Sequence, residues 1–483
     1  MLELSLSALA VPVFWAIAEW RIGLLLCLLT AILQDPLRKL TPKEPVFFVV
    51  FVGVVFGGMC LGAMARGVSL SPKSLFKRHS HLARPILFLL VLIVVQAFNS
   101  YLRFENPFIT LTGLLTYLLP LPSIICAYQL ICRQGEFRIN QFMMWYIVCI
   151  GLALTTIYLE YSGYDWQVLG PVGVQLIIFD AVTGHQLPSF SGSFRAAEIG
   201  AWHAMAAACF VLLMTFSRRV TSTRVLYAVI VVAFLLGLGI LTGRRKIIVE
   251  FAVFVSSYAI LWIILERGIG KLAIAGIVGI ALIAYGWLAS AIVEPVRTQQ
   301  DSELSTYSRY VDHTENAFRA VPSRFVDLGI APVMWAYNTY GLFGAGLGVG
   351  TQGTQHFGGG GDIAGAAEGG LGKITLELGV PGLLLMGWLA ISILRYLWWT
   401  VRVASRYSRR IARLAMGCFS FLVANVAGFS VATQAYGDLF ILLILSWTLA
   451  FLLSVPVLLE REVKVRQFST VETRPPVLRP RPA

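Results

Sequence analysis

Three cations occupy a very short turn between two apolar segments of the chain. The turn reads TGRRK, from Thr242 to Lys246, and includes Arg244 and Arg245. Guanidinium groups bind phosphate through paired hydrogen bonds and stay charged at physiological pH. The turn therefore indicates an anion site at the membrane surface, with snorkelling of the cations to lipid headgroups as the structural alternative. Glu250, at i+4 on the following helix, is expected to pair with Lys246.

A second group of charges opens another apolar segment, SGSFRAAEIGAWH, from Ser191 to His203. On a helix Arg195, Glu198 and Trp202 share one face. We expect Arg195 to contact an anionic substrate, with Glu198 holding it in place. The alternative is an interfacial salt bridge that anchors the helix end. His203 faces elsewhere and is expected to be packed inside the protein.

A glycine-rich stretch, Gly341–Gly382, ends in a single carboxylate and a further apolar segment. Its alternating glycines, including Gly346 and Gly348, permit positive φ or close approach of a ligand to the backbone. Glu368 lies at the mouth of the apolar segment and is a candidate general base. The alternative role for Glu368 is a capping carboxylate at the helix start.

The composition places these residues in a membrane protein. The chain has 483 residues, of which 57% are hydrophobic and 13% charged, whereas soluble proteins have about 25% charged residues. The net charge of +13 does not indicate nucleic-acid binding, because no soluble basic domain is present to carry it. The seven cysteines have no metal-ligand spacing, and no P-loop or dinucleotide motif occurs. We therefore predict no metal and no cofactor.

Recurrent apolar segments predict an all-α polytopic membrane protein with about twelve transmembrane helices, each long enough to cross roughly 30 Å of hydrocarbon. Glu19 and Arg21 interrupt the first segment, which is alternatively two short helices. The predicted spans are Val11–Leu33, Val46–Met64, Leu82–Phe98, Phe108–Ile131, Phe142–Tyr161, Ala196–Phe216, Val225–Leu241, Ile247–Leu265, Leu272–Val293, Leu371–Leu394, Ile411–Val431 and Leu439–Leu458.

Clusters of Lys and Arg orient these spans. Basic loops after the second, sixth and tenth spans fall on one side, which we predict to be cytoplasmic together with a basic, Pro-rich tail. The opposite side carries two long loops, and the second contains a predicted amphipathic helix, Arg324–Tyr340. The predicted organisation is nine helices in residues 1–293 (with the first loop at 162–195), a large extracytoplasmic loop at 294–370, three helices in 371–458, and the tail at 459–483.

These motifs resemble those of the bacterial O-antigen ligase and O-antigen or exopolysaccharide polymerase family. The ligase motif is a His, then Asn, Ser or Gln, nine residues, and GxxG. Here Glu368-Gly369 precedes nine residues and then Gly379–Gly382, so Glu368 replaces the His. The GAGLGVG run is similar to the family's G-x-G-x-G. Thr242–Arg245 is similar to its T-x-S-R turn, and Arg324 matches its loop arginine.

The resemblance implies a multi-pass protein of the bacterial inner membrane with a periplasmic active site. It would polymerise oligosaccharide repeats linked to undecaprenyl pyrophosphate, without a metal and with inversion. Arg245, Arg324 and Arg195 would bind the pyrophosphate, and Glu368 would activate the acceptor. Chain-length regulators or export proteins are further implied partners. The alternatives are an O-antigen ligase, which uses lipid A-core or another acceptor, and a flippase. The flippase is disfavoured because no inverted repeat is visible.

Overall fold

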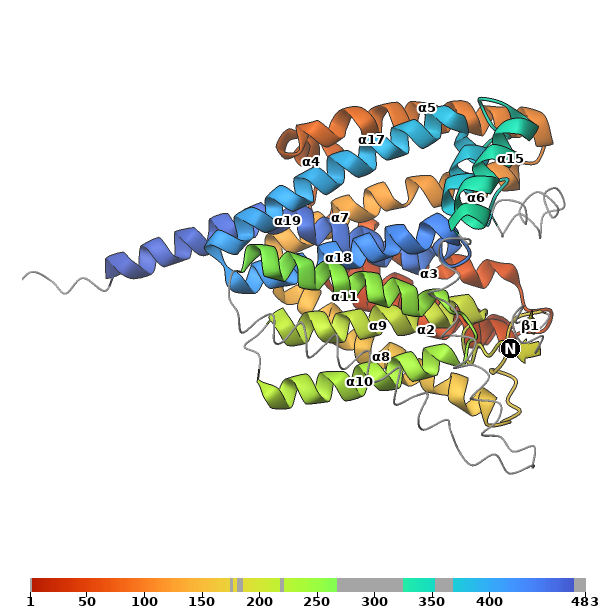
Figure 1. Cartoon of the computed structure of the whole chain (residues 1–483), viewed down its shortest axis with the longest axis horizontal. Coiled ribbons are helices and arrows are strands. Elements are labelled where there is room, and N and C mark those ends of the chain that lie inside the picture. The colour runs from red at the N-terminus through yellow and green to blue at the C-terminus, as the bar shows by residue number, and fades with distance from the viewer. Residues whose placement is uncertain are drawn as a thin grey trace, which may run out of the picture.

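The computed structural model describes residues 2–173, 177–179, 186–217, 221–266, 325–351 and 368–472. In these residues the fold is almost entirely helical (Figure 1). In chain order the elements are α1 (Leu2–Ala18), η1 (Trp20–Ile22), α2 (Gly23–Leu40), η2 (Val46–Val50), α3 (Phe51–Ala65), α4 (Pro72–Arg78), α5 (Ser80–Phe104), α6 (Pro107–Leu118), α7 (Pro120–Gln134), α8 (Phe137–Tyr161), β1 (Ile177–Phe179), β2 (Gln186–Pro188), α9 (Ala197–Ser217), α10 (Ser222–Ile240), α11 (Lys246–Leu265), η3 (Phe325–Ile330), α15 (Ala331–Tyr340), α17 (Gly370–Tyr407), α18 (Arg409–Val431), η5 (Ala435–Gly437) and α19 (Leu439–Glu472).

Eleven helices among the described residues are long and apolar enough to cross a membrane, so the chain is an all-α polytopic membrane protein. The single first span predicted at Val11–Leu33 is wrong. The chain instead forms α1, breaks at Glu19, and continues into a span at Trp20–Leu40. The break agrees with the alternative of two helices. The predicted ninth span, Leu272–Val293, lies outside the described residues.

Local signals explain where several helices begin and bend. Asn106 caps α6 by accepting a hydrogen bond from the Phe108 N–H at 3.0 Å, and Pro107 follows it in the first turn. Within α17 the backbone at Gly379 leaves helical geometry, with φ of 71° and ψ of −174°. Pro381 follows this break and cannot donate a backbone hydrogen bond.

Helix α9 lies at the centre of the bundle and packs against α8, α10, α11 and α18. Its alanines, Ala204 and Ala206–Ala208, are fully buried, and such small residues let neighbouring helices approach closely. A second group, α5 with α17, lies along one side of the bundle with α6 and α15 at its end (Figure 1). The residues of the candidate site come from the ends of both groups and from α2, η2 and the loop before α19.

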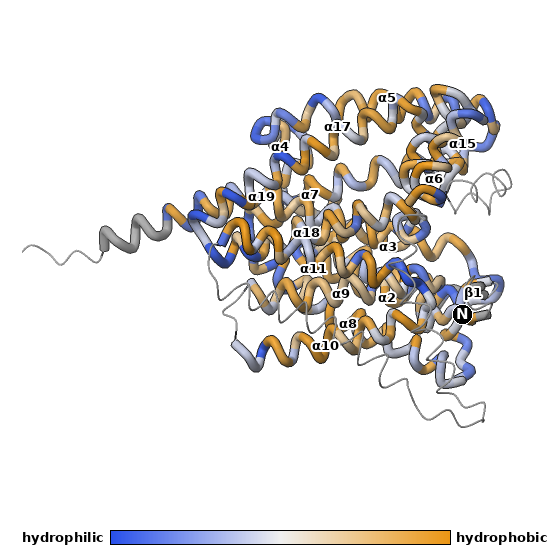
Figure 2. Tube along the Cα trace, viewed as in Figure 1, coloured by the Kyte–Doolittle hydropathy of each residue, from blue (hydrophilic) through white to orange (hydrophobic). Residues whose placement is uncertain are grey.

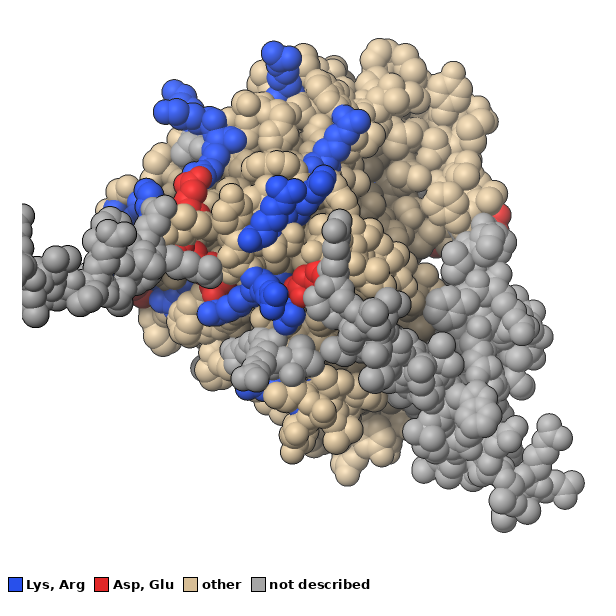
Figure 3. All heavy atoms as spheres, turned by 60° about the vertical axis from the view of Figure 1, so that its left-hand side comes forward, with Lys and Arg blue, Asp and Glu red and all other residues tan. Residues whose placement is uncertain are grey.

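The two ends of the bundle differ in charge. Apolar residues fill the middle of the helices and polar residues occupy the ends (Figure 2). One end carries α4 and the α17–α18 junction, and Lys and Arg gather there (Figure 3). We call it the basic end; its described cations include Arg66, Lys73, Lys77, Arg78, Arg84, Arg133, Arg138, Arg224, Arg402, Arg406, Arg409, Arg410, Arg413, Arg461 and Lys464. Where they are described, the basic loops that we predicted to share a side do so; Arg218, Arg219 and the tail beyond Glu472 lie outside the described residues.

The long predicted loops are only partly described. The first contains a short antiparallel pair, in which β1 and β2 match Ile178 with Leu187. In the second, η3 is one π-helical turn that runs into α15, so a helix is present where Arg324–Tyr340 predicted one. Helix α19 continues to Glu472, so the predicted tail at 459–483 begins as helix.

Candidate functional site

A cavity of about 600 Å³ opens at the end of the bundle opposite the basic end, which we call the cavity end. Its walls come from the end of α2, from η2, α6 and α17, and from the loops before α9 and α19. Four cations line it, namely Arg38, Lys43, Arg195 and Lys373. Two carboxylates, Glu44 and Glu198, line it as well. The cationic excess suits an anionic ligand.

Arg195 lies in this cavity as predicted, but its partners are not the predicted ones. Its guanidinium pairs with Asp438 at 2.5 Å and with Asp35 at 3.4 Å, and its backbone N–H donates to Asp35 at 3.0 Å. Burial alone would raise the pKa of Asp438, yet the Arg195 charge lowers this pKa below its usual value. Two carboxylates thus fix Arg195 and balance its charge.

Glu198, which we predicted to hold Arg195, pairs instead with Arg244 at 2.6 Å. The TGRRK turn is thereby joined to the start of α9 at the cavity wall. Arg245 is the cap residue of α11 and does not line the cavity. Lys246 donates to the Gln434 side chain at 3.5 Å. The charges of Lys246 and Glu250 interact, as predicted, but no hydrogen bond or direct ion pair joins these two described side chains.

Two cations of the cavity are deeply buried and make no direct ion pair with a described carboxylate, although the charges of Asp35 and Glu44 act on Arg38. Arg38 is 5% exposed, and its Nε donates to the Glu44 carbonyl oxygen at 3.0 Å. Lys373 is also 5% exposed, and its ammonium has no hydrogen bond or ion pair with any described residue. A buried cation needs a compensating charge. These two side chains are therefore the best-placed groups to bind an anion.

Lys39 secures the loop that precedes α9. Its ammonium donates to the carbonyl oxygens of Val168, Gly192 and Phe194 at 3.1, 2.8 and 2.7 Å. Glu160 accepts from the Gly192 backbone N–H at 2.6 Å. Since this loop carries Arg195, the contacts position one wall of the cavity.

Gly346 and Gly348 pack against helices and do not line the cavity. Gly346 and Gly348 have φ of 114° and 88°. A Cβ at Gly346 would lie 2.7 Å from the Ser100 backbone, and one at Gly348 would lie 2.1 Å from the Ile109 carbonyl oxygen. Their positions therefore give no support to the predicted substrate contact. The run reaches the cavity only at its end, through Gly350 and Thr351.

Glu368 lies beside the cavity but does not line it. Its side chain is exposed, and its carbonyl oxygen accepts from the Thr433 N–H and hydroxyl at 2.9 and 3.0 Å. Thr433 does line the cavity, so Glu368 stands next to its rim. Arg324 lies outside the described residues. His203 is packed as predicted, with Nδ1 2.6 Å from the Tyr146 hydroxyl.

The sequence analysis missed Arg38, Lys43, Glu44 and Lys373. A usable signal was present for Arg38, Lys43 and the adjacent Glu44. The 34–45 segment carries three cations, Arg38, Lys39 and Lys43, on the side of the membrane where positive charge should be scarce. The same reasoning had identified the TGRRK turn. Lys373 had no comparable signal, because a single lysine near a span end is ordinary.

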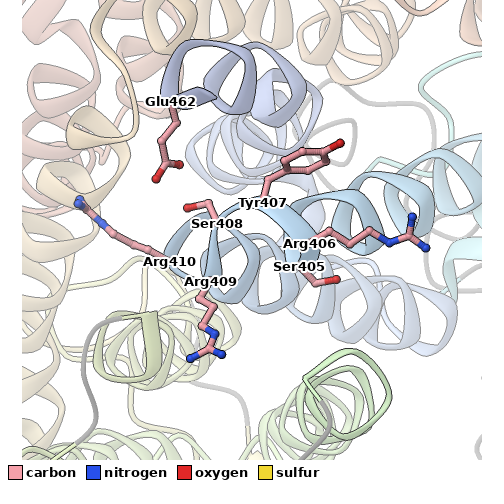
Figure 4. Close-up of a pocket in the computed structure, with 7 residues that line it drawn as sticks. All are labelled: Ser405, Arg406, Tyr407, Ser408, Arg409, Arg410 and Glu462. Atoms are coloured by element: carbon pink, nitrogen blue, oxygen red, sulfur yellow. The ribbon is translucent and has the colours of Figure 1, made fainter. Parts of the chain in front are cut away.

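A second pocket, of about 560 Å³, lies at the basic end between α17, α18 and α19. The Arg406 and Arg409 side chains extend away from each other (Figure 4), and Arg410 pairs with Glu136 at 2.6 Å. Glu462 points toward Ser408 from the facing helix (Figure 4). These arginines do not converge on a common point, so this pocket is a weaker candidate than the cavity.

No protein-family model matches the chain, and a search of the curated proteins finds no match. Within the described residues no group of three His, Cys, Asp or Glu side chains is arranged to hold a metal ion. All seven cysteines are free thiols. The candidate site therefore rests on the geometry and charge of the cavity.

Proposed function

We propose that the protein is a membrane glycosyltransferase that polymerises oligosaccharide units linked to polyprenyl pyrophosphate, and that it acts at the extracytoplasmic face. The supporting observation is a single cavity that combines buried cations with an apolar wall. The short family motifs around Arg245 and Glu368 point to the same reaction.

The buried cations suit the pyrophosphate of the donor. Lys373 and Arg38 are each 5% exposed, and Lys373 makes no hydrogen bond or ion pair with a described residue. A pyrophosphate would give Lys373 a negatively charged partner, and would give Arg38 a further one beside Asp35 and Glu44. In the reaction these cations would stabilise the charge that develops on the leaving pyrophosphate, a role that a metal ion fills in other enzymes.

The apolar wall suits the polyprenyl chain. Val46, Val49 and Val50 of η2 line the cavity, as does Leu115 of α6. Val50 and Leu115 are 41% and 40% exposed and lie on membrane-facing helices, so the wall continues onto the apolar surface of the bundle. An amphiphile can place its headgroup among the cations and its chain in the bilayer. A soluble nucleotide sugar has no group for this wall.

The polymerase and the ligase would share this donor and differ in the acceptor. The presence of Glu368 where the ligase motif has a His favours the polymerase. A flippase would bind the same lipid but would leave its glycan unchanged. Analysis of the reaction products therefore distinguishes the polymerase, the ligase and the flippase.

Donor binding tests the proposal directly. The full-length protein in lipid nanodiscs is expected to bind undecaprenyl pyrophosphate more tightly than undecaprenyl monophosphate. Lys373→Met should weaken binding by about 10- to 100-fold, because hydrogen bonds to charged groups contribute about 1.5–3 kcal/mol. Lys77→Met, at an exposed position of the basic end, is the matched control and should bind as the wild type does.

Turnover tests the reaction class. Cells that lack the gene should accumulate single lipid-linked repeat units, and the purified wild-type protein should convert this extract into longer lipid-linked chains. Extension without a second enzyme supports the polymerase. Transfer to a new acceptor without extension would indicate the ligase, and an unchanged glycan would overturn both.

A further inference from the structure

Transfer to a sugar hydroxyl needs a group that accepts the hydroxyl proton. The carboxylates in or beside the cavity include five that are poorly suited. Asp35 and Asp438 pair with Arg195, and Glu198 pairs with Arg244. Glu377 is fully buried and accepts from the Gly350 N–H and the Thr351 hydroxyl. Glu368 lies outside the lining. We propose that Glu44 is the general base; this inference rests on the proposed function.

The backbone holds Glu44 at a defined position on the cavity wall. Lys43 and Glu44 have φ of 64° and 43°, a region that non-glycine residues rarely adopt, and Pro45 follows them. The residue before a proline ordinarily prefers an extended backbone. Two contacts maintain the turn: the Glu44 N–H donates to the Thr41 carbonyl at 3.0 Å, and Arg38 donates to the Glu44 carbonyl at 3.0 Å.

The Glu44 carboxylate is available for this role. It lines the cavity, is partly buried, and accepts no hydrogen bond from any described residue. Its own backbone carbonyl contacts Arg38, one of the two buried cations that would bind the donor. The turn would therefore bring together the group that binds the leaving pyrophosphate and the group that activates the acceptor.

The chemical step conserves atoms and charge. The acceptor hydroxyl gives its proton to the Glu44 carboxylate, and its oxygen forms a bond to the anomeric carbon of the donor. The bond between that carbon and the pyrophosphate oxygen breaks, and its electron pair leaves with polyprenyl pyrophosphate. Protonated Glu44 then releases its proton to water. No oxidant, reductant or further reactant is needed.

Two substitutions remove the base while keeping the fold. Glu44→Gln retains size, and Glu44→Gly accepts the positive φ without steric strain. The matched control is Glu105→Gly, since Glu105 is exposed, has φ of 48° and lies outside the cavity lining. Each full-length variant is assayed for undecaprenyl pyrophosphate binding and for extension of lipid-linked repeats from deletion cells.

Both Glu44 variants are expected to bind undecaprenyl pyrophosphate as the wild type does and to lose turnover by about 10²–10⁴-fold. Added formate should restore part of the Glu44→Gly activity. If Glu44→Gln keeps more than about a tenth of wild-type turnover, or if formate fails to restore Glu44→Gly, Glu44 is not the base.

A wild-type protein that extends no glycan overturns the proposed function itself. Loss confined to Glu368→Gln assigns the base to Glu368.

Discussion

The cations at this site differ in role because their partners differ. Arg195 lies between two carboxylates, whereas Lys373 has no partner among the described residues. Breaking a buried ion pair from one side leaves uncompensated charge and is strongly destabilising. Arg195 is therefore expected to maintain the cavity, and Lys373 to bind the ligand.

Arg195→Met tests the structural role of this arginine. The change leaves Asp35 and Asp438 buried without their shared partner, at side-chain exposures of 5% and 3%. We expect a loss of about 3–5 kcal/mol in unfolding free energy at pH 7, measured by denaturation in detergent. Arg402→Met, at an exposed position without a described partner, should leave stability unchanged.

The effect of Arg195→Met should depend on pH with a defined sign. The folded protein holds the pKa of Asp438 below its usual value of about 4. The stabilisation is therefore fully present above about pH 4 and is lost as the pH falls through the lowered pKa. The stability difference between wild type and variant should shrink only in that acidic range. A difference that shrinks between pH 8 and 5 would contradict this assignment.

At the scale of elements, the glycine run joins α17 to α5 and α6. The Ala345 N–H donates to the Leu376 carbonyl at 2.7 Å, and the Leu347 N–H donates to the Gln96 carbonyl at 3.2 Å. Glu377 accepts from the Gly350 N–H at 2.9 Å. The run thus packs beside the bend in α17 and fixes the helix start that carries Lys373.

Two glycines with nearly the same positive φ separate the cost of that φ from the cost of close packing. Gly341 and Gly344 have φ of 72° and 73°. A Cβ at Gly341 would meet nothing within 4 Å, whereas one at Gly344 would lie 2.6 Å from the Leu376 carbonyl oxygen. We expect Gly341→Ala to cost about 1–2 kcal/mol, and Gly344→Ala about 1–3 kcal/mol more.

Thermal denaturation of both alanine variants in detergent measures this difference. Equal melting temperatures would show that the Gly344 backbone has more room than the structure gives it. Loss of undecaprenyl pyrophosphate binding in Gly344→Ala alone would further indicate that the run positions Lys373.

The spans were predictable from sequence because apolar length is a local property. The charges of Glu19 and Arg21 suggested a break in the first apolar segment. Whether the helix breaks there depends on how α1 packs on α3. The ion pairs were not predictable. Helical spacing suggested Arg195 with Glu198, whereas the partners Asp35 and Asp438 lie 160 and 243 positions away. Only tertiary packing brings them together.

For the glycine run, the residue type indicated a close approach to the backbone, but the sequence did not identify the group that approaches. Gly346 and Gly348 permit close approach either to a ligand or to another backbone, and sequence alone cannot distinguish these outcomes. The neighbouring Ser100 and Ile109 decide it, and both come from helices more than 200 residues earlier.

At the scale of the whole molecule, the elements that line the cavity and those of the basic end lie at opposite ends of the bundle (Figure 1). Short loops rich in Lys and Arg remain in the cytoplasm. The cavity is therefore expected to open on the outer face. Pro42→Cys, exposed next to Lys43, and Lys77→Cys, exposed on α4, report on the two ends.

In spheroplasts a membrane-impermeant maleimide should label Pro42→Cys directly and Lys77→Cys only after the membrane is opened. The unsubstituted chain is the control, since its seven cysteines are buried or half-buried. The reverse pattern would place the buried cations in contact with the cytoplasm, where soluble nucleotides compete for any anion site. The proposed transfer would then lose its basis. The cavity is suited to a lipid-linked pyrophosphate only if it opens where such a lipid is the available activated donor.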